Sequence, residues 1–199
     1  MQLWVGLGNP EPGMARQRHN IGFMAVEAIA ARHRFSPWRV RFKGLIAEGQ
    51  IGTQKIILLK PMTYMNLSGE AVQEAAHFYK IPPAEIILFH DELDLAAGKI
   101  RIKKGGGNAG HNGLRSTDKR LATPDYWRVR LGIGHPGDKE RVTGWVLGDF
   151  SKADQGWLMP LLQDIAAEAP LLAEAKMDDF MTRLAAIGNQ KPEGRSNGV

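Results

Sequence analysis

Hydrophobic and polar residues recur along this chain with two different periods, which predict strands and helices in alternation. Short apolar runs bounded by glycine or acidic residues predict buried strands, whereas apolar residues three or four positions apart predict helices. The strands are expected at 3–8, 85–93, 99–104 and 126–134, with a two-stranded hairpin at 44–61. The helices are expected at 21–33, 66–80, 111–121, 151–175 and 177–187.

Strands that alternate with helices, together with one hairpin, predict an α/β fold. We expect a single globular domain over 1–187, with a mixed, partly parallel, twisted sheet flanked by helices and with a helical C-terminal third. A chain of 199 residues is long enough for one such domain with a substantial core. The remaining segment, 188–199, is mainly polar and is expected to be a disordered tail.

The helix predicted at 66–80 has residues typical of helix ends at both of its termini. Ser68 is a suitable N-cap, because a serine hydroxyl can accept a hydrogen bond from the backbone of the first turn. Glu70 lies in that turn, where the helix dipole favours a carboxylate. Pro82 and Pro83 end the helix, since proline lacks the amide hydrogen that would continue it.

Charge and cysteine content narrow the possible partners and compartments. The net charge is +5, and basic residues are concentrated in 99–107, 114–120 and 127–130. Such clusters occur on surfaces that bind nucleic acid and also on ordinary solvated faces. The chain has no cysteine, which excludes disulfides, thiolate metal ligands and a cysteine nucleophile and agrees with a cytoplasmic protein. No apolar run approaches the roughly 20 residues that span a bilayer, so we expect no membrane segment and no signal peptide.

Several familiar catalytic and nucleotide-binding patterns are absent from the sequence. VGLGNPE (5–11) places Gly6 and Gly8 as a dinucleotide fingerprint requires, but Glu11 stands where the third glycine is needed. GGGNAGHNG (105–113) lacks the Gly-Lys-Ser/Thr of a P-loop. No serine lies in a Gly-x-Ser-x-Gly motif, and no two of the six histidines have the spacing of helical metal ligands. Covalent, metal-dependent and nucleotide-dependent chemistry are therefore all poorly supported.

Polar residues in loops and at strand ends form the remaining candidate site. In open α/β sheets, the loops at the carboxyl ends of the strands converge and bind ligands. One histidine, one aspartate and several amides, without a serine or cysteine, suit general-base activation of water, in which the aspartate orients the imidazole. Each of these residues taken singly is also a common turn former or helix cap. They are Asn9, His19, Asn20, Asn66, Asp91 and Asn112.

Six short motifs, in their order and spacing, closely resemble those of the bacterial peptidyl-tRNA hydrolase family. The resemblance extends over roughly the first 150 residues, and the helical C-terminal third fits it less specifically. The motifs are VGLGNP (5–10), RHNIG (18–22), KPMTYMNLSG (60–69), HDELDLAAGKIRIK (90–103), GGGNAGHNGLRS (105–116) and RLGIGHPG (130–137).

The resemblance implies a cytoplasmic esterase, usually monomeric, that needs no metal or other cofactor. Such an enzyme hydrolyses the ester between a peptide and the 3′ end of tRNA, which recycles tRNA from peptidyl-tRNA that leaves the ribosome early. Peptidyl-tRNA is therefore the expected partner, and the stalled large ribosomal subunit is a further candidate.

Residues of this chain correspond by motif position to the functional residues of the family. His19 corresponds to the catalytic general base and Asp91 to the carboxylate that assists it. The residues that correspond to contacts with the substrate or the tRNA 3′ end are Asn9, Met14, Tyr64, Asn66 and Asn112. Those that correspond to a clamp for the tRNA 5′-phosphate are Arg101, Lys103 and Arg130.

Two positions depart from the family pattern. Met14 stands where the family often has a substrate-contacting tyrosine, so a contact there would be apolar. Asn108 replaces a histidine in the glycine loop, which leaves a role for the side chain at this position open. The loop is expected to form a rim, poor in side chains, that brings Asn112 to the tRNA 3′ end, while catalysis is assigned to His19 and Asp91 rather than to His111.

The sequence leaves two other classes of function open. The first is a non-catalytic tRNA- or ribosome-binding module of the same fold, which would need a broken histidine–aspartate pair, although His19 and Asp91 are both present. The second is a nucleotide-dependent enzyme, against which the incomplete glycine patterns argue.

Overall fold

The computed structural model describes residues 1–190 of the chain. Its centre is a seven-stranded mixed sheet in the order β2-β3-β4-β1-β5-β7-β6. β4, β1, β5 and β7 are parallel neighbours, whereas β2, β3 and β6 are paired antiparallel at the two sides. The strands are β1 (Gln2–Gly6), β2 (Arg39–Arg41), β3 (Gly44–Ile51), β4 (Gln54–Pro61), β5 (Ile86–Glu92), β6 (Ile100–Lys104) and β7 (Trp127–Gly132).

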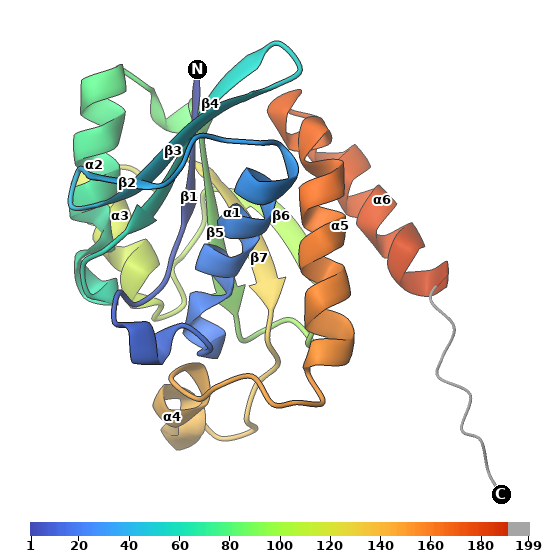
Figure 1. Ribbon diagram of the computed structural model, residues 1–199. Helices are drawn as coiled ribbons and strands as arrows, with labels where there is room; N and C mark the ends of the chain where they lie inside the picture. The colour runs from blue at the N-terminus through green and yellow to red at the C-terminus, as the bar shows by residue number, and fades with distance from the viewer. Residues whose placement is uncertain (191–199) are drawn as a thin grey trace, which may run out of the picture.

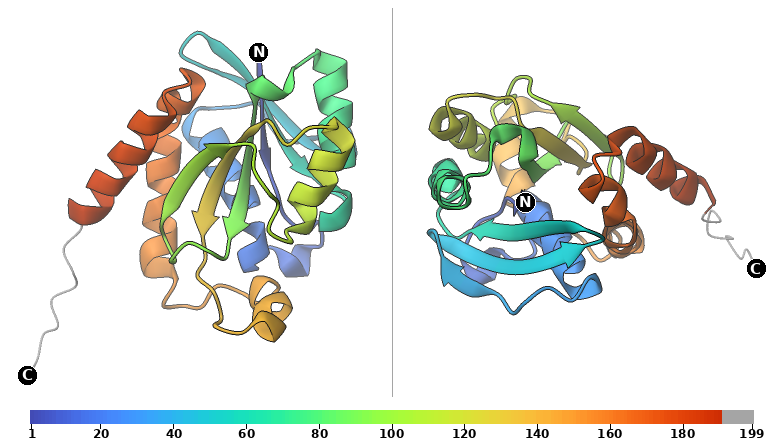
Figure 2. Two further views of the ribbon diagram at one scale, coloured as in Figure 1. Left: turned by 180° about the vertical axis from the view of Figure 1, so that it is seen from behind. Right: turned by 90° about the horizontal axis from the view of Figure 1, so that it is seen from above.

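Helices cover both faces of this sheet, which gives the fold three layers (Figure 1 and Figure 2). α2 and α3 pack on one face, and α1, α5 and α6 pack on the other. The helices are α1 (Ile21–Arg32), α2 (Ser68–Tyr79), α3 (Asn112–Leu121), α4 (Val142–Val146), α5 (Gln155–Ala173) and α6 (Met177–Gln190). None of the helices within the described part of the chain has both the length and the apolar character that crossing a bilayer requires.

Alternating side chains of the strands supply two hydrophobic cores, one on each face of the sheet. In β1, Trp4 belongs to the core beneath α1 and α5, while Leu3 and Val5 belong to the core beneath α2. In β5, Phe89 and Leu88 are divided between the two cores in the same way. All five side chains are fully buried, as expected for strands that are covered on both faces.

The predicted α/β fold with a mixed sheet is confirmed, and the hairpin at 44–61 forms β3 and β4. Periodicity does not predict β2 or α4, which have only three and five residues. The prediction of Ser68 as N-cap of α2 is wrong. Leu67 holds that position, and the hydroxyl of Ser68 instead donates to the carbonyl oxygen of Met65 at 2.8 Å.

The C-terminal third is helical, as predicted, and its helices are long. α5 continues through Pro160 and Pro170. α6 packs on α5 and β6 and ends at Gln190, three residues beyond the predicted domain boundary at 187. The rest of the predicted tail, 191–199, lies outside the described residues.

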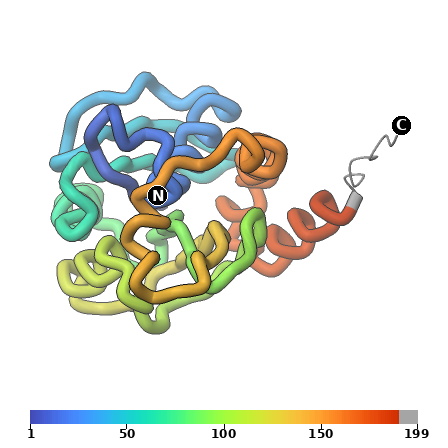
Figure 3. The backbone as a smooth tube through the Cα atoms, turned by 90° about the horizontal axis from the view of Figure 1, so that it is seen from below, coloured from blue at the N-terminus to red at the C-terminus, as the bar shows by residue number. Residues whose placement is uncertain are grey.

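The carboxyl ends of the parallel strands meet at one edge of the sheet, at the bottom of Figure 1. The loop from β1 to α1, the end of β5 and the first residues of α3 all reach this edge. Seen from below, the segment that carries α4 crosses in front of it (Figure 3). Loops from distant parts of the sequence therefore surround one place in the fold.

α1 begins in direct contact with the sheet. A Cβ atom on Gly22 would lie 2.4 Å from the carbonyl oxygen of Phe89 and 2.6 Å from the amide nitrogen of Leu7. A Cβ atom on Gly6 would lie 2.2 Å from the carbonyl oxygen of Gly22. Only glycine allows this close approach of backbones, and it brings His19, in the 3-10 turn before α1, to the end of β5.

Substitution of Gly22→Ala is expected to lower the free energy of unfolding by about 1–3 kcal/mol, because the added methyl group would collide with backbone atoms. Thermal unfolding followed by circular dichroism measures the loss. Gly156→Ala in α5 is the matched control, since a Cβ atom there meets nothing within 4 Å. Equal melting temperatures of the two variants would contradict the close packing of α1 on the sheet.

Candidate active site

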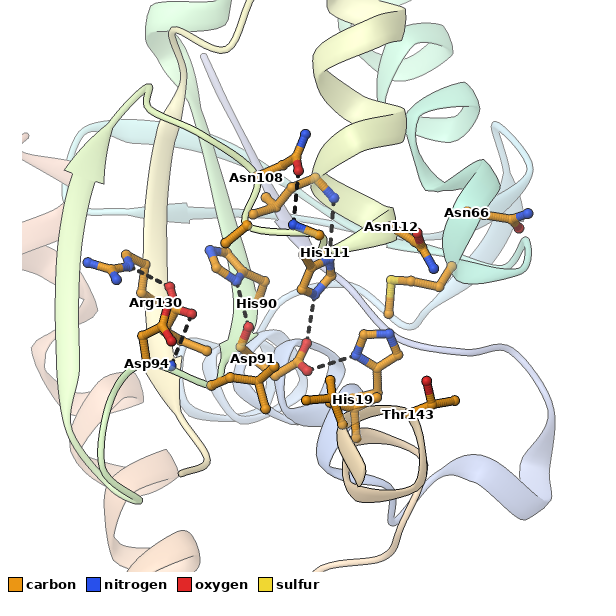
Figure 4. A pocket seen from close by; sticks show the side chains of 18 of the residues that line it. His19, Asn66, His90, Asp91, Asp94, Asn108, His111, Asn112, Arg130 and Thr143 are labelled. Carbon is orange, nitrogen blue, oxygen red and sulfur yellow. Dashed lines mark hydrogen bonds and ion pairs between the residues drawn. The ribbon is translucent and has the colours of Figure 1, made fainter. Parts of the chain in front are cut away.

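A cleft of about 900 Å³ opens at the carboxyl edge of the sheet (Figure 4). The loop after β1, the turn before α2, the end of β5, the glycine loop with the start of α3, and α4 form its walls. The predicted site residues that line it are Asn9, His19, Tyr64, Asn66, Asp91, Lys103, Asn112 and Arg130. Met14 and Arg101, which also belong to the described part of the chain, lie outside its lining.

Asp91, at the end of β5, occupies the centre of the cleft, and its side chain is 2% exposed. Its Oδ2 lies 2.8 Å from Nδ1 of His19, and its Oδ1 lies 2.8 Å from Nε2 of His111. Figure 4 shows the two imidazole rings held by the same carboxylate. Each oxygen of the buried carboxylate therefore has a hydrogen-bond donor, which offsets the cost of removing its charge from water.

The backbone of α3 fixes the tautomer of His111. This histidine is the N-cap of the helix, and its Nδ1 accepts hydrogen bonds from the amides of Gly113 at 3.1 Å and Leu114 at 3.3 Å. An accepting nitrogen needs its lone pair, so the proton of the neutral ring is on Nε2, which faces Asp91. The imidazole thus caps the helix on one side and donates to the carboxylate on the other.

His19 has the opposite orientation. Its Nδ1 faces the carboxylate of Asp91 and donates to it, so the neutral ring carries its lone pair on Nε2. The side chain is 11% exposed and lines the cleft. A histidine that is oriented by a buried carboxylate and keeps a basic nitrogen for the cleft has the arrangement of a general base.

The pKa values of this pair favour an ionised carboxylate next to an imidazole that is readily protonated. Burial opposes ionisation of Asp91, but attraction to His19 and His111 and their hydrogen bonds outweigh burial and hold the pKa of Asp91 well below its usual range. Burial also opposes protonation of His19, but the charge and hydrogen bond of Asp91 raise the pKa of His19 above 6.5. Asp91 therefore stabilises the imidazolium form of its partner.

His90 precedes Asp91 and forms a buried, neutral part of the site. Its Nδ1 donates to the backbone carbonyl oxygen of Asp91 at 2.8 Å. Burial, together with the nearby His111, lowers the pKa of His90 to about 3. This histidine is therefore neutral at physiological pH, and the proton chemistry of the cleft is left to His19.

The side chain of Asn20 holds the loop that follows β1 in place through two hydrogen bonds to its backbone. The amide nitrogen of Asn9 donates to Oδ1 of Asn20 at 2.9 Å, and Nδ2 of Asn20 donates to the carbonyl oxygen of Asn9 at 3.0 Å. The side-chain amide of Asn9 in turn donates to Oε1 of Gln17 at 3.3 Å. The amide of Asn9 is thus held in place in the wall of the cleft, whereas Asn20 is 1% exposed and supports the backbone.

The other predicted substrate contacts lie on the outer wall. Tyr64, Asn66 and Asn112 are exposed, and the two asparagines lie on the same side of the histidine pair in Figure 4. The hydroxyl of Tyr64 donates to Oε1 of Glu11 at 3.2 Å. Met14, half-buried at the end of a 3-10 turn, belongs to the same loop as Glu11, outside the cleft lining.

The residues predicted to bind phosphate lie on two paired strands. Arg101 on β6 is paired with Arg130 on β7, and Lys103 is paired with Arg128. Directly paired residues share one face of a sheet, so the four side chains start from the same face of the sheet, opposite the core that contains Val129 and Ile102. Arg130 donates through Nε to Oε1 of Glu92 at 2.7 Å, which partly compensates its charge.

Three side chains at the site could in principle hold a metal ion. The possible ligand atoms of His19, Asp91 and His111 lie within 4.8 Å of one another. However, a neutral imidazole has one lone pair, and His111 already uses it on Nδ1 to cap α3. Its Nε2 therefore carries a proton and donates to the carboxylate, so the hydrogen-bonded arrangement does not fit a metal centre.

The contact of His111 with Asp91 is a feature of this site that the sequence does not predict. His111 directly precedes α3, the position at which N-caps occur, but histidine is not among the usual capping residues. Its contact with Asp91 joins segments that are 20 residues apart. Only the course of the glycine loop between them reveals that both side chains meet.

Comparisons with known proteins show what the whole chain resembles. The sequence model that describes peptidyl-tRNA hydrolase matches residues 3–193. The chain is 69% identical over 189 residues to the peptidyl-tRNA hydrolase of Granulibacter bethesdensis, which covers 95% of this chain and 97% of that protein. It is 64% identical over 187 residues to that of Acidiphilium cryptum, with 94% and 97% coverage. A crystal structure of peptidyl-tRNA hydrolase from Acinetobacter baumannii has a TM-score of 0.87 and 40% identity, and the match covers 94% of this chain and 95% of that chain.

The pKa of His19 is expected to lie above 6.5 and to fall below this value in Asp91→Asn, because the variant keeps the burial but removes the charge. A pH titration of the imidazole signals by NMR measures both values. The raised pKa stabilises the fold below pH 6.5, and this contribution is lost as the pH rises through the pKa of folded His19. An unchanged titration of His19 in Asp91→Asn would show that the pair is not coupled.

Proposed function

This chain belongs to the peptidyl-tRNA hydrolase family, and on this premise we propose how its cleft hydrolyses the ester that joins a peptide to the 3′ end of tRNA. The observation that carries the proposal is the orientation of His19. Its Nδ1 lies 2.8 Å from the buried carboxylate of Asp91, so Nε2 is the basic atom for the cleft. General-base hydrolysis needs a histidine in this arrangement and a water molecule, and it requires no cofactor.

The reaction proceeds in two steps. Neutral His19 takes a proton from water through Nε2 while the water oxygen attacks the carbonyl carbon of the ester. The resulting imidazolium is stabilised by Asp91, which stays ionised because its pKa is low. Collapse of the tetrahedral intermediate breaks the bond between the acyl carbon and the ribose oxygen, and His19 returns the proton to that oxygen. The products are the peptide carboxylic acid and free tRNA.

Side-chain amides around the cleft recognise the peptide without reading its sequence. An amide can both donate and accept, so Asn9, Asn66 and Asn112 can pair with the backbone of any peptide. We assign the developing oxyanion to Asn66 or Asn112, and loss of that donor is expected to raise the barrier by about 2–4 kcal/mol. A free α-amino group is disfavoured because its charge would have to be desolvated.

His111 adjusts the strength of the base. As the second donor to Asp91, it shares the negative charge that would otherwise act on His19 alone. A general base is most effective when its pKa lies near the working pH, so a carboxylate shared between two imidazoles suits catalysis near neutrality. In this role His111 acts through Asp91 and exchanges no proton with the substrate.

The basic strands β6 and β7 bind the tRNA backbone in this proposal. Lys103 and Arg130 line the cleft. Arg101, on the outermost strand β6, extends the same row of cationic side chains. Contacts with phosphate release counterions and do not depend on base sequence, which suits an enzyme that accepts many tRNAs.

Further proposals rest on the family resemblance alone. They are that the enzyme acts as a monomer, that it works in the cytoplasm and that the stalled large ribosomal subunit is a second partner. A non-catalytic tRNA-binding module of the same fold is less well supported, because His19 and Asp91 form an intact pair.

Substitution of His19→Ala is expected to lower kcat by about 10²- to 10⁴-fold, because it removes the base that activates water. The assay follows release of the acyl group from N-acetyl-aminoacyl-tRNA, with unblocked aminoacyl-tRNA and a chelator as further arms. His77→Ala, an exposed histidine on α2, is the matched control. Activity of His19→Ala within a few-fold of wild type, or loss of wild-type activity with chelator, would refute the mechanism.

Substitution of Lys103→Ala is expected to raise KM and to weaken the dependence of KM on salt, since each phosphate contact contributes a slope of roughly 0.7 to 0.9 in the logarithmic plot. KM is measured between low and physiological ionic strength. Lys55→Ala is the control, because this exposed lysine lies on the hairpin at the start of β4. If both variants respond to salt as wild type does, the phosphate contact lies elsewhere.

A further inference from the structure

Arg128 is a fully buried arginine for which the mechanism above has no role. It lies on β7, and its side chain is 0% exposed. Its Nη1 donates to the carbonyl oxygen of Gly107 at 2.7 Å, and its Nη2 donates to Oδ1 of Asp118 at 3.0 Å. The same carboxylate oxygen accepts from the hydroxyl of Tyr126 at 2.6 Å. One guanidinium therefore joins the glycine loop to the middle of α3.

The course of the glycine loop shows why this connection matters. β6 ends at Lys104, which is paired with Trp127 at the start of β7. Asp91 is paired with Leu131, near the opposite end of β7. The loop must therefore run back along the sheet before His111 can reach the carboxylate.

The loop has few side chains with which to hold that course. Positive φ angles occur at Gly105, Gly106, Ala109 and Gly110. A Cβ atom on Gly107 would meet nothing within 4 Å, so packing does not fix this residue. Its position depends on hydrogen bonds of the backbone, and the bond from Arg128 is short and charge-assisted.

We propose that Arg128 is a positioning residue for the hydrolysis and that it acts through His111. By holding Gly107 and Asp118 together, it fixes the segment between them and keeps Nε2–H of His111 on the carboxylate of Asp91. The inference rests on the proposed roles of His19 and Asp91. Arginine suits the task because its planar guanidinium presents two terminal nitrogens in a rigid fork, whereas the single ammonium of lysine cannot reach both partners.

The test is Arg128→Lys, which keeps the positive charge and removes the fork. We expect kcat on N-acetyl-aminoacyl-tRNA to fall roughly ten- to a hundred-fold through misplacement of the site. The acid limb of the pH profile should move to higher pH, because Asp91 then acts on His19 alone. His111 at the start of α3 is the group that acts on the pair of His19 and Asp91 from another element. His90 on β5 lies beside His111 and Asp91, and Arg128 acts on His90. His111→Ala should move the limb in the same direction, and the double variant should move it no further.

Three controls separate the possible outcomes. Arg39→Lys, at an exposed ion pair on β2, should leave the kinetics unchanged. Asp118→Asn weakens the same connection, so it should shift the acid limb in the same direction even if Arg128→Lys does not fold. A lower melting temperature of Arg128→Lys or Asp118→Asn with wild-type kcat and pH profile would overturn the proposal and show a purely structural role. If His19→Ala remains active in the same assay, the proposed mechanism itself is wrong.

Discussion

The site depends on keeping one negative charge buried. Asp91 is almost inaccessible to water, yet it stays ionised because each carboxylate oxygen has its own N–H donor. Without those donors, the cost of desolvation would favour the neutral acid. The donors come from His19 before α1 and His111 before α3, so three distant segments are held together around a single charge. The interaction that stabilises this part of the fold is also the one that sets the strength of the base.

The backbone makes that arrangement possible. β5 lies between β1 and β7 with apolar side chains toward both cores, and only at its end does the sequence change to His90 and Asp91. The contact of Gly22 with the sheet brings the start of α1 to the same edge. Two buried layers thus leave one open edge at which polar side chains can meet, and the cleft lies there.

Periodicity in the sequence is enough to predict most of this fold. The strands and helices that bury a face repeat their apolar residues clearly, whereas β2 and α4 are too short to show any period. Ser68 is wrongly predicted as the N-cap of α2, because the 3-10 turn before the helix supplies the N-cap position, Leu67, and Ser68 is the first helical residue. In the site, His19 and Asp91 are predictable because both lie in distinctive motifs, His19 in the loop between β1 and α1 and Asp91 at the end of β5, although their contact spans 72 residues.

The contacts of His111 and Arg128 are not predictable by the same reasoning. Both depend on the course of a loop whose residues are mostly glycine and whose conformation few side chains determine. Arg128 also looks like a polar residue on the solvent face of an alternating strand, whereas it is fully buried against the glycine loop and Asp118 of α3. Whether distant segments bury one face of a strand depends on the whole fold, so the sequence of the strand itself does not indicate it.

The double use of the His111 ring links the catalytic site to the local stability of a helix. When the first turn of α3 opens, the amides of Gly113 and Leu114 leave Nδ1, and the ring is free to exchange tautomers. The cap of α3 and one donor to Asp91 therefore come from a single ring. Protection of the amides of Gly113 and Leu114 against exchange with solvent thus reports on the order of the side chain that shares Asp91 with His19.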